Sequence, residues 1–106
     1  MIEHINWSKI AERSYGQILE YIAGEFGKTR AKKFAIKVFV DVSKLPANPG
    51  LGQKEPLLEG ARYEFRRLVI DNLTKVIYRI TDDSIEIADV WDARKDPKDL
   101  VQHLID

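Results

Sequence analysis

The sequence contains no cysteine, and its only histidines are His4 and His103. Without cysteine the chain cannot form a disulfide, a thiolate metal site or a cysteine nucleophile. The two histidines are far apart in the sequence, which argues against a histidine metal cage. No other cluster of metal-ligating residues is visible, so we expect neither a metal ion nor a cofactor.

Long hydrophobic runs and an excess of either charge are also missing. No apolar stretch approaches the roughly 20 residues that a membrane-spanning helix needs. Residues 1–6 lack the basic and apolar regions of a signal peptide. The 17 Lys and Arg residues balance the 17 Asp and Glu residues, so the chain has no strong field for nucleic acid. These absences predict a soluble cytoplasmic protein without a membrane partner.

The composition is that of an ordinary globular domain. Of the 106 residues, 44% are hydrophobic and 32% are charged, which rules out wholesale disorder. A chain of this length can bury one hydrophobic core without disulfides. We expect a single domain that spans residues 1–106.

The first half of the chain predicts a short strand followed by two helices. Residues 2–7 alternate in part and suggest a strand. Ser8 is a predicted N-cap, and apolar residues then recur in steps of three and four as far as Phe26. Gly27 is placed to end this helix, and Thr29 to cap the next one. Helices so close together should form an antiparallel hairpin.

The second helix should end at Pro46, and the second half then changes to a period of two. Residues 46–61 are a predicted loop. Antiparallel strands are expected from Arg62 to about residue 70, over 75–81 and over 85–91, with a bulge near Arg66–Arg67.

A short helix should follow the third strand and begin at Asp96-Pro97. On the third strand, alternation places Ile85, Ile87, Asp89 and Trp91 on one face. The resulting order predicts an α+β fold, in which the helix hairpin packs on one face of an antiparallel sheet and the other face stays partly open.

Several short motifs occur along the chain in a characteristic order. They are Trp7-Ser8, Phe26-Gly27, Leu45-Pro46, Asn48-Pro49-Gly50-Leu51-Gly52-Gln53, Arg66-Arg67-Leu68-Val69, Val76-Ile77-Tyr78-Arg79-Ile80 and Val90-Trp91-Asp92-Ala93-Arg94-Lys95-Asp96-Pro97. In order and spacing, the chain resembles the RelE/ParE superfamily of toxins from bacterial type II toxin–antitoxin systems, over about residues 6–98. The Pro-Gly-x-Gly loop is similar to that of ParE-type members.

This resemblance implies a small cytoplasmic toxin that arrests growth unless a cognate antitoxin binds it. Antitoxins of this kind usually wrap the toxin with an extended C-terminal segment. Two activities occur in the superfamily. RelE- and YoeB-like members cut mRNA in the ribosomal A site without a metal ion, whereas ParE-like members poison DNA gyrase and are not nucleases.

The resemblance also suggests candidate catalytic residues. RNA cleavage needs a base for the 2′-hydroxyl, a cation for the phosphorane and an acid for the leaving oxygen. Glu55 matches the base of YoeB-like nucleases, and Arg66 and Arg67 match an arginine pair. Lys75 stands where the catalytic arginine would be, and Arg94 falls at a basic position of the family.

The C-terminal His-Tyr pair of YoeB-like nucleases is missing, because Ala93 and Arg94 stand about where it would be. With the neutral net charge, this favours a ParE-like, gyrase-directed toxin. Two alternatives remain: a ribosome-dependent mRNA endoribonuclease, and a non-toxic interaction module with the same fold.

Each candidate residue also has a purely structural interpretation. Glu55 can be a solvated loop carboxylate, and Lys75 a solubilising residue at a strand end. Arg66 and Arg67 should point to opposite faces of their strand, where one of them can pair with an acidic residue such as Glu64.

Overall fold

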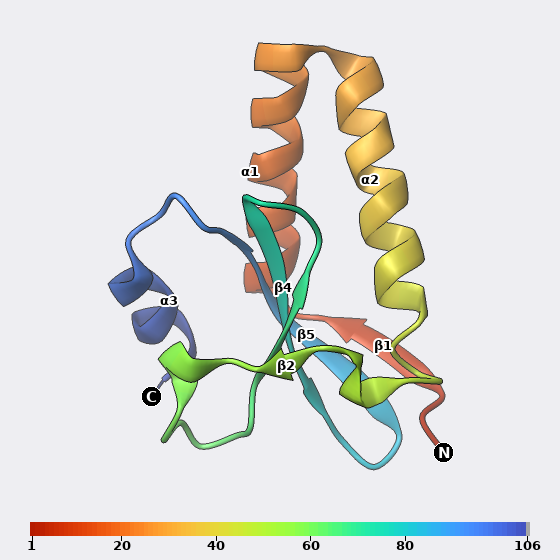
Figure 1. Ribbon diagram of the computed structural model, residues 1–106, viewed down its shortest axis with the longest axis vertical. Helices are drawn as coiled ribbons and strands as arrows, with labels where there is room; N and C mark the ends of the chain where they lie inside the picture. The colour runs from red at the N-terminus through yellow and green to blue at the C-terminus, as the bar shows by residue number, and fades with distance from the viewer. Residues whose placement is uncertain (106) are drawn as a thin grey trace.

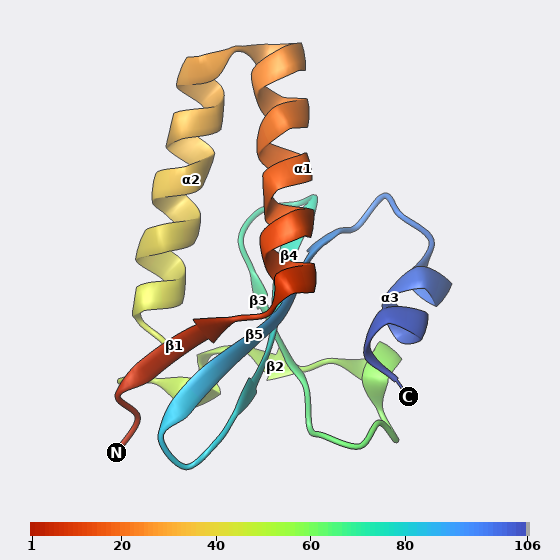
Figure 2. The same ribbon diagram turned by 180° about the vertical axis from the view of Figure 1, so that it is seen from behind.

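The computed structural model describes residues 1–105. It has an α+β architecture in which helices cover both faces of one sheet. A hairpin of two long helices packs on one face of a five-stranded sheet (Figures 1 and 2). A short C-terminal helix, α3 (Pro97–Leu104), lies against the other face. The α+β fold predicted from the sequence is confirmed.

The helix hairpin consists of α1 (Lys9–Phe26) and α2 (Lys28–Ser43). Ser8 caps α1 as predicted, since its Oγ accepts a hydrogen bond from the Ala11 N–H at 3.0 Å. Gly27 alone links the helices and has a φ of 95°, a conformation that favours glycine. The predicted cap at Thr29 is wrong, because α2 already begins directly after Gly27.

The sheet has the strand order β1-β5-β4-β3-β2. Its strands are β1 (His4–Trp7), β2 (Gln53–Lys54), β3 (Arg66–Val69), β4 (Thr74–Ile80) and β5 (Ser84–Asp92). The strands β3 to β5 pair antiparallel, as expected, β2 adds an unpredicted antiparallel strand beside β3, and β1 runs parallel to β5. The sheet is therefore mixed, with β1 at one edge and the short β2 at the other.

A β-bulge interrupts the pairing of β4 with β5. Ile77 lies opposite Asp89, but the next residue, Tyr78, lies opposite Ile87. Ala88 is thus one extra residue in β5, and it shifts the alternation of every residue that follows.

This bulge lies in a different strand from the predicted one. The strands β3 and β4 pair in unbroken register, so the bulge expected at Arg66–Arg67 is wrong. The predicted single face of β5 is wrong for the same reason. Ile85 and Ile87 belong to the core beneath the helix hairpin, whereas Trp91 belongs to the core beneath α3.

The two faces of the sheet carry separate hydrophobic cores. The larger core, beneath the hairpin, contains Ala11, Phe34, Val38, Val42, Leu45, Leu68, Ile70, Val76, Tyr78, Ile85, Ile87 and Val90. The smaller core, beneath α3, contains Leu58, Phe65, Ile77, Trp91 and Leu100. The expectation of a partly open second face is therefore wrong, because α3 and the segment before β3 cover it.

The segment between α2 and β3 is more ordered than the predicted loop. It contains two 3₁₀ turns, η1 (Pro49–Leu51) and η2 (Pro56–Leu58), with β2 between them. Strand β3 begins only at Arg66, four residues later than predicted, and it pairs with β2 through the register Gln53↔Arg67.

Tyr78 fixes this segment to the centre of the sheet. Its hydroxyl donates a hydrogen bond to the Pro49 carbonyl at 2.7 Å and accepts one from the Gly52 N–H at 2.9 Å. Burial raises the pKa of the Tyr78 hydroxyl above its ordinary value, which keeps the donor protonated. The Pro-Gly-x-Gly motif is thus a backbone fold built around one buried hydroxyl.

Gly52 lies too close to its neighbours to carry a side chain. A Cβ atom at Gly52 would lie 2.4 Å from the Arg67 carbonyl oxygen and 2.7 Å from the Tyr78 hydroxyl. Gly50, in the same loop, has no atom within 4 Å of the corresponding position. The loop therefore depends on one of its two glycines for close packing.

We expect Gly52→Ala to lower the free energy of unfolding by about 1–3 kcal/mol, because the added methyl group forces the loop away from β3. Urea unfolding of the full chain measures this. Gly50→Ala is the matched control and should change stability by less than about 1 kcal/mol in either direction. Equal effects of both substitutions would contradict the close approach at Gly52.

Candidate functional site

Glu55 lies between β2 and η2, where the backbone turns over the edge of the sheet. Its side chain caps η2, since Oε2 accepts a hydrogen bond from the Leu57 N–H at 3.2 Å. Its own N–H donates to the Phe65 carbonyl at 2.9 Å. Glu55 is only 3% exposed, so the interpretation of Glu55 as a solvated loop carboxylate is wrong.

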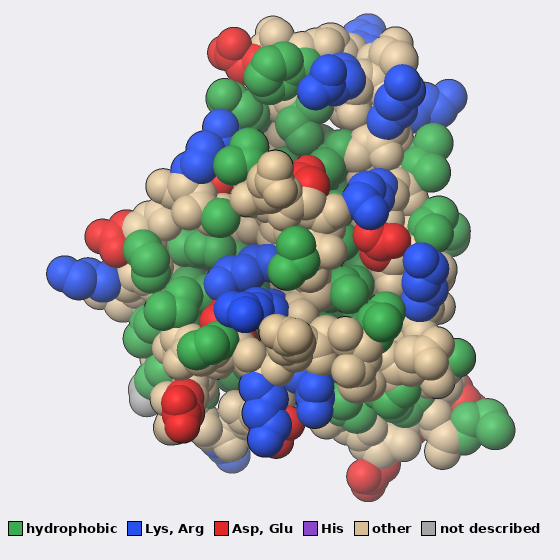
Figure 3. Space-filling model, viewed as in Figure 1, with side chains coloured by type: hydrophobic (Ala, Val, Ile, Leu, Met, Phe, Trp, Pro, Cys, Tyr) green, Lys and Arg blue, Asp and Glu red, His purple; other side chains and the backbone are tan. Residues whose placement is uncertain are grey.

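Two cations from the sheet meet the buried Glu55 carboxylate. The ammonium group of Lys75, on β4, forms an ion pair with Oε1. Arg67, on β3, has its Nη1 atom 3.6 Å from Oε2. We call these three residues the Glu55 triad. In the view of Figure 3, Lys and Arg side chains gather near the middle of the molecular surface that faces the reader.

The Glu55 triad commits both carboxylate oxygens. Lys75 occupies one oxygen, while Arg67 and the Leu57 N–H share the other. A buried carboxylate is costly unless it is paired in this way, and loss of one partner leaves an uncompensated charge. Lys75 itself is only 16% exposed in its side chain, so it is not the solubilising residue that its place at a strand end suggested.

Arg66 points away from the triad and supports the Pro-Gly-x-Gly loop. Its Nη1 donates to the Gly52 carbonyl at 2.7 Å, and its Nη2 lies 3.5 Å from Oε1 of Glu64. The prediction that Arg66 and Arg67 face opposite ways, and that one pairs with an acidic residue, is confirmed. Both in fact pair with a carboxylate.

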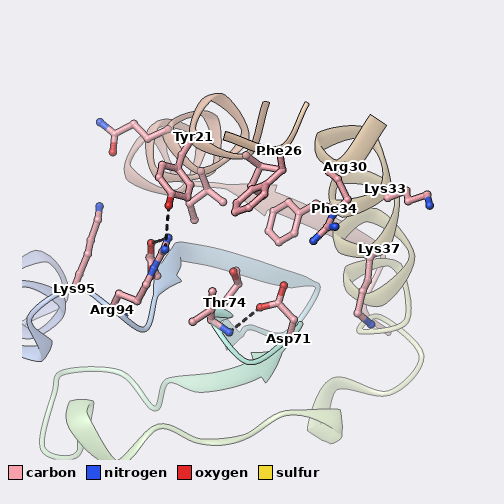
Figure 4. A pocket seen from close by; sticks show the side chains of 15 residues that line it. Tyr21, Phe26, Arg30, Lys33, Phe34, Lys37, Asp71, Thr74, Arg94 and Lys95 are labelled. Carbon is pink, nitrogen blue, oxygen red and sulfur yellow. Dashed lines mark hydrogen bonds and ion pairs between the residues drawn. The ribbon is translucent and has the colours of Figure 1, made fainter. Parts of the chain in front are cut away.

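Arg94 lies apart from the Glu55 triad, in the segment between β5 and α3. Its Nε and Nη2 donate to the two carboxylate oxygens of Asp92 at 3.0 and 2.8 Å. The guanidinium carbon lies 4.9 Å from the ring centroid of Tyr21, on α1, and Nη1 is 3.4 Å from the Tyr21 hydroxyl (Figure 4). Asp92 and Tyr21 therefore hold Arg94 in one orientation.

The bidentate pair fixes the charges of both partners. The hydrogen bonds from Arg94 hold the pKa of the Asp92 carboxyl below its usual range. The hydrogen bonds to Asp92, together with the one to Tyr21, raise the pKa of the Arg94 guanidinium above its already high ordinary value. Arg94 is thus a permanent cation and not a proton donor near neutral pH.

Arg94 stands at the mouth of a groove between the helix hairpin and the β3–β4 turn. The groove has a volume of about 650 Å³. Its apolar lining includes Ile18, Tyr21, Ile22, Phe26, Phe34 and Leu73. Its rim carries the cations Arg30, Lys33, Lys37, Arg94 and Lys95 (Figure 4). The two acidic residues of the lining are Asp71 and Asp92, and Asp92 is already paired with Arg94.

The structure thus divides the predicted site residues into two places. Glu55, Arg67 and Lys75 come together, Arg66 lies on the neighbouring loop side, and Arg94 belongs to the groove. Sequence analysis missed the partners of Arg94. The spacing Asp92-x-Arg94 is a local signal for one of them. Tyr21 lies 73 residues away in the chain and falls outside the predicted helical stripe, so no local pattern points to it.

Neither a metal-binding cluster nor a membrane-spanning helix is found among residues 1–105. No group of three or more His, Asp or Glu side chains is arranged to hold a metal ion. No helix of this part of the chain is both long and apolar enough to cross a membrane.

Two solved structures resemble this fold over nearly their full length. The chromosomal ParDE toxin–antitoxin system from P. aeruginosa matches with a TM-score of 0.69 and 19% identity, covering 87% of this chain and 96% of that one. The YoeB dimer from Staphylococcus aureus matches with a TM-score of 0.56 and 20% identity, covering 86% and 97%. No curated protein is a significant match in sequence.

The sequence model of the ParE toxins of type II toxin–antitoxin systems (parDE) matches residues 5–97. This match includes the Pro-Gly-x-Gly loop, the Glu55 triad and Arg94, and it agrees with the folds of both neighbours. The chain therefore belongs to the family of ParE toxins of type II toxin–antitoxin systems.

Proposed function

We propose that this toxin arrests growth by poisoning DNA gyrase and does not cut mRNA. The observation that carries the proposal is the buried state of Glu55, the candidate base of a nuclease. Its side chain has no exposed surface, and both of its oxygens already have partners. The ParE family match supports the same target class.

A general base must reach the proton that it removes. In this superfamily the proton sits on a ribose 2′-hydroxyl, which would have to come within about 3 Å of a carboxylate oxygen. Because the Glu55 side chain is fully buried, a ribose could reach its carboxylate only if the side chains that cover it moved away and weakened the ion pairs with Lys75 and Arg67. This argues for Glu55 as a structural residue.

The second requirement of a nuclease, a general acid, is not met at the expected place. Arg94 stands about where the His-Tyr pair of YoeB-like nucleases would be, and it is held as a cation by Asp92. A guanidinium stabilises negative charge but gives up no proton near neutral pH. At the Glu55 and Arg94 positions the protein therefore offers charge for a partner surface and no acid–base pair for RNA cleavage.

We further propose that the groove binds a segment of the cognate antitoxin. Its apolar lining fits the hydrophobic face of an amphipathic segment, and its cationic rim fits acidic residues beside that face. Tyr21 and Arg94, stacked on each other, are of two residue types that are enriched among the hot spots of interfaces. Binding at this place would leave the Glu55 triad uncovered by the groove-bound segment.

The gyrase proposal is tested with the purified full-length chain in two assays. In the first, purified gyrase, relaxed plasmid and ATP are present, and we expect enzyme-linked DNA breaks to accumulate. In the second, translating ribosomes are present, and we expect the bound mRNA to stay intact. Ribosome-dependent mRNA cleavage without gyrase-linked breaks would contradict the proposal, as would the absence of both effects.

Glu55→Gln separates a structural carboxylate from a catalytic one in the same assays. We expect the variant to be less stable and to retain gyrase trapping within about threefold once the folded fraction is matched. Glu59→Gln, at an exposed glutamate of the same segment, is the matched control. A folded Glu55→Gln variant that loses an mRNA cleavage shown by the wild type would assign Glu55 as a base.

The groove proposal predicts that Arg94→Ala weakens antitoxin binding by roughly tenfold or more, as expected for an interface hot spot. Titration calorimetry with the purified antitoxin measures this. Lys28→Ala, at an exposed cation of α2 outside the groove lining, is the control and should bind normally. Unchanged affinity of Arg94→Ala would place the antitoxin elsewhere.

A further inference from the structure

A second cluster of cations surrounds an exposed aromatic ring beside the start of β3. The Tyr63 side chain is 42% exposed. The guanidinium carbon of Arg79, on β4, lies 4.1 Å from the centre of the Tyr63 ring, and that of Arg62 lies 5.4 Å from it. Phe65 supports the ring from the core side, edge to face at 6.3 Å. We call Arg62, Tyr63, Arg66 and Arg79 the Tyr63 patch.

The Tyr63 patch borders a hollow in the protein surface. The hollow has a volume of about 210 Å³ and is lined by Tyr63, Glu64, Arg66, Arg79 and Ile80. Arg66 is fixed there by the Gly52 carbonyl and by Glu64, so its position is set before any ligand arrives. Glu64 also lies within 4.0 Å of Lys54, a further cation at this edge. The Glu64 carboxylate is thus paired with Arg66 and Lys54, whereas Arg62 and Arg79 lie against the Tyr63 ring.

We propose that the Tyr63 patch binds a single-stranded nucleic acid. The Arg79 guanidinium lies over the Tyr63 ring at 4.1 Å, and a guanidinium plane held on an aromatic ring is itself a stacking surface for an unpaired base. Guanidinium groups also match phosphate oxygens with paired N–H donors. The Tyr63 patch has both a stacking surface and phosphate-binding cations beside one hollow. An ordinary solvated charged surface has only the cations.

The chemistry favours a polynucleotide over an acidic protein segment. Carboxylates of a peptide would use the cations but would place no planar group on the stacked Tyr63 ring and Arg79 guanidinium. A nucleotide has both a phosphate and a π-face, and the hollow accommodates about the volume of a small planar group. The zero net charge of the chain predicts modest affinity, because no long-range field adds to the local contacts.

This site is independent of the gyrase proposal, and its test uses no gyrase. Fluorescence anisotropy of labelled 12-nucleotide strands, one DNA and one RNA of the same sequence, measures binding to the full-length chain. We expect the logarithm of the binding constant to fall by roughly 1.5–2 per log unit of salt. This corresponds to about two or three phosphate contacts, since each contact to a single strand contributes about 0.7. The DNA and RNA arms distinguish which strand the patch prefers, and a duplex of the same sequence should bind less tightly.

Substitutions within the patch should change this binding in separate ways. We expect Tyr63→Leu to weaken it roughly tenfold through lost stacking, and Tyr63→Phe to preserve it. Arg79→Ala should weaken binding and lower the salt slope by about 0.7. Arg13→Ala removes an exposed cation of α1 outside the patch and should leave binding unchanged. Urea unfolding of each variant confirms that the fold is intact.

Three results would overturn the proposal. The first is no binding of either strand at low salt. The second is equal loss of binding in Arg13→Ala and Arg79→Ala, which would indicate unspecific attraction. The third is tight binding of an acidic peptide, such as a Glu-rich 12-mer, with no binding of the oligonucleotides. That outcome would make the patch a protein-docking surface.

Discussion

The position of the Glu55 triad depends on the hydrogen bonds of the buried Tyr78 hydroxyl. This hydroxyl binds the Pro49 carbonyl and the Gly52 N–H at once, so it holds the Pro-Gly-x-Gly loop against the middle of the sheet. The loop leads directly into β2. Glu55 follows β2 in the chain and pairs there with Arg67 and Lys75. A motif that resembles a family signature in sequence is, in the fold, a means of placing one carboxylate.

That placement changes what the carboxylate can do. A solvent-exposed glutamate can act as a base, but a buried one with both oxygens paired to cations serves to neutralise the charges around it. Further cations lie along the groove rim and around Tyr63. The protein therefore presents charged and aromatic surfaces suited to binding, consistent with its membership of the ParE toxins.

Local patterns in the sequence predict the helix hairpin, the cap at Ser8, the antiparallel meander and the start of α3, because each rests on contacts between near neighbours. They fail where one residue reorganises distant ones. The extra residue Ala88 moves Trp91 to the other face of the sheet, and the hydrophobic periodicity of the sequence does not predict this bulge. The sequence also does not predict the contacts of the candidate site residues, because the pairing of Glu55 with Lys75 spans 20 residues and the stacking of Arg94 on Tyr21 spans 73. Such contacts arise from tertiary packing alone.

If Glu55 is a buried counter-ion, its charge is energetically coupled to that of Lys75, and a double-mutant cycle measures this coupling. Urea unfolding of the wild type, Glu55→Gln, Lys75→Met and the double variant gives the coupling energy of the pair. We expect at least about 1 kcal/mol, as for contacting residues in a buried network. The exposed pair Lys54 and Glu64, 4.0 Å apart, is the control and should show coupling near zero. A Glu55–Lys75 coupling equally close to zero would contradict the account.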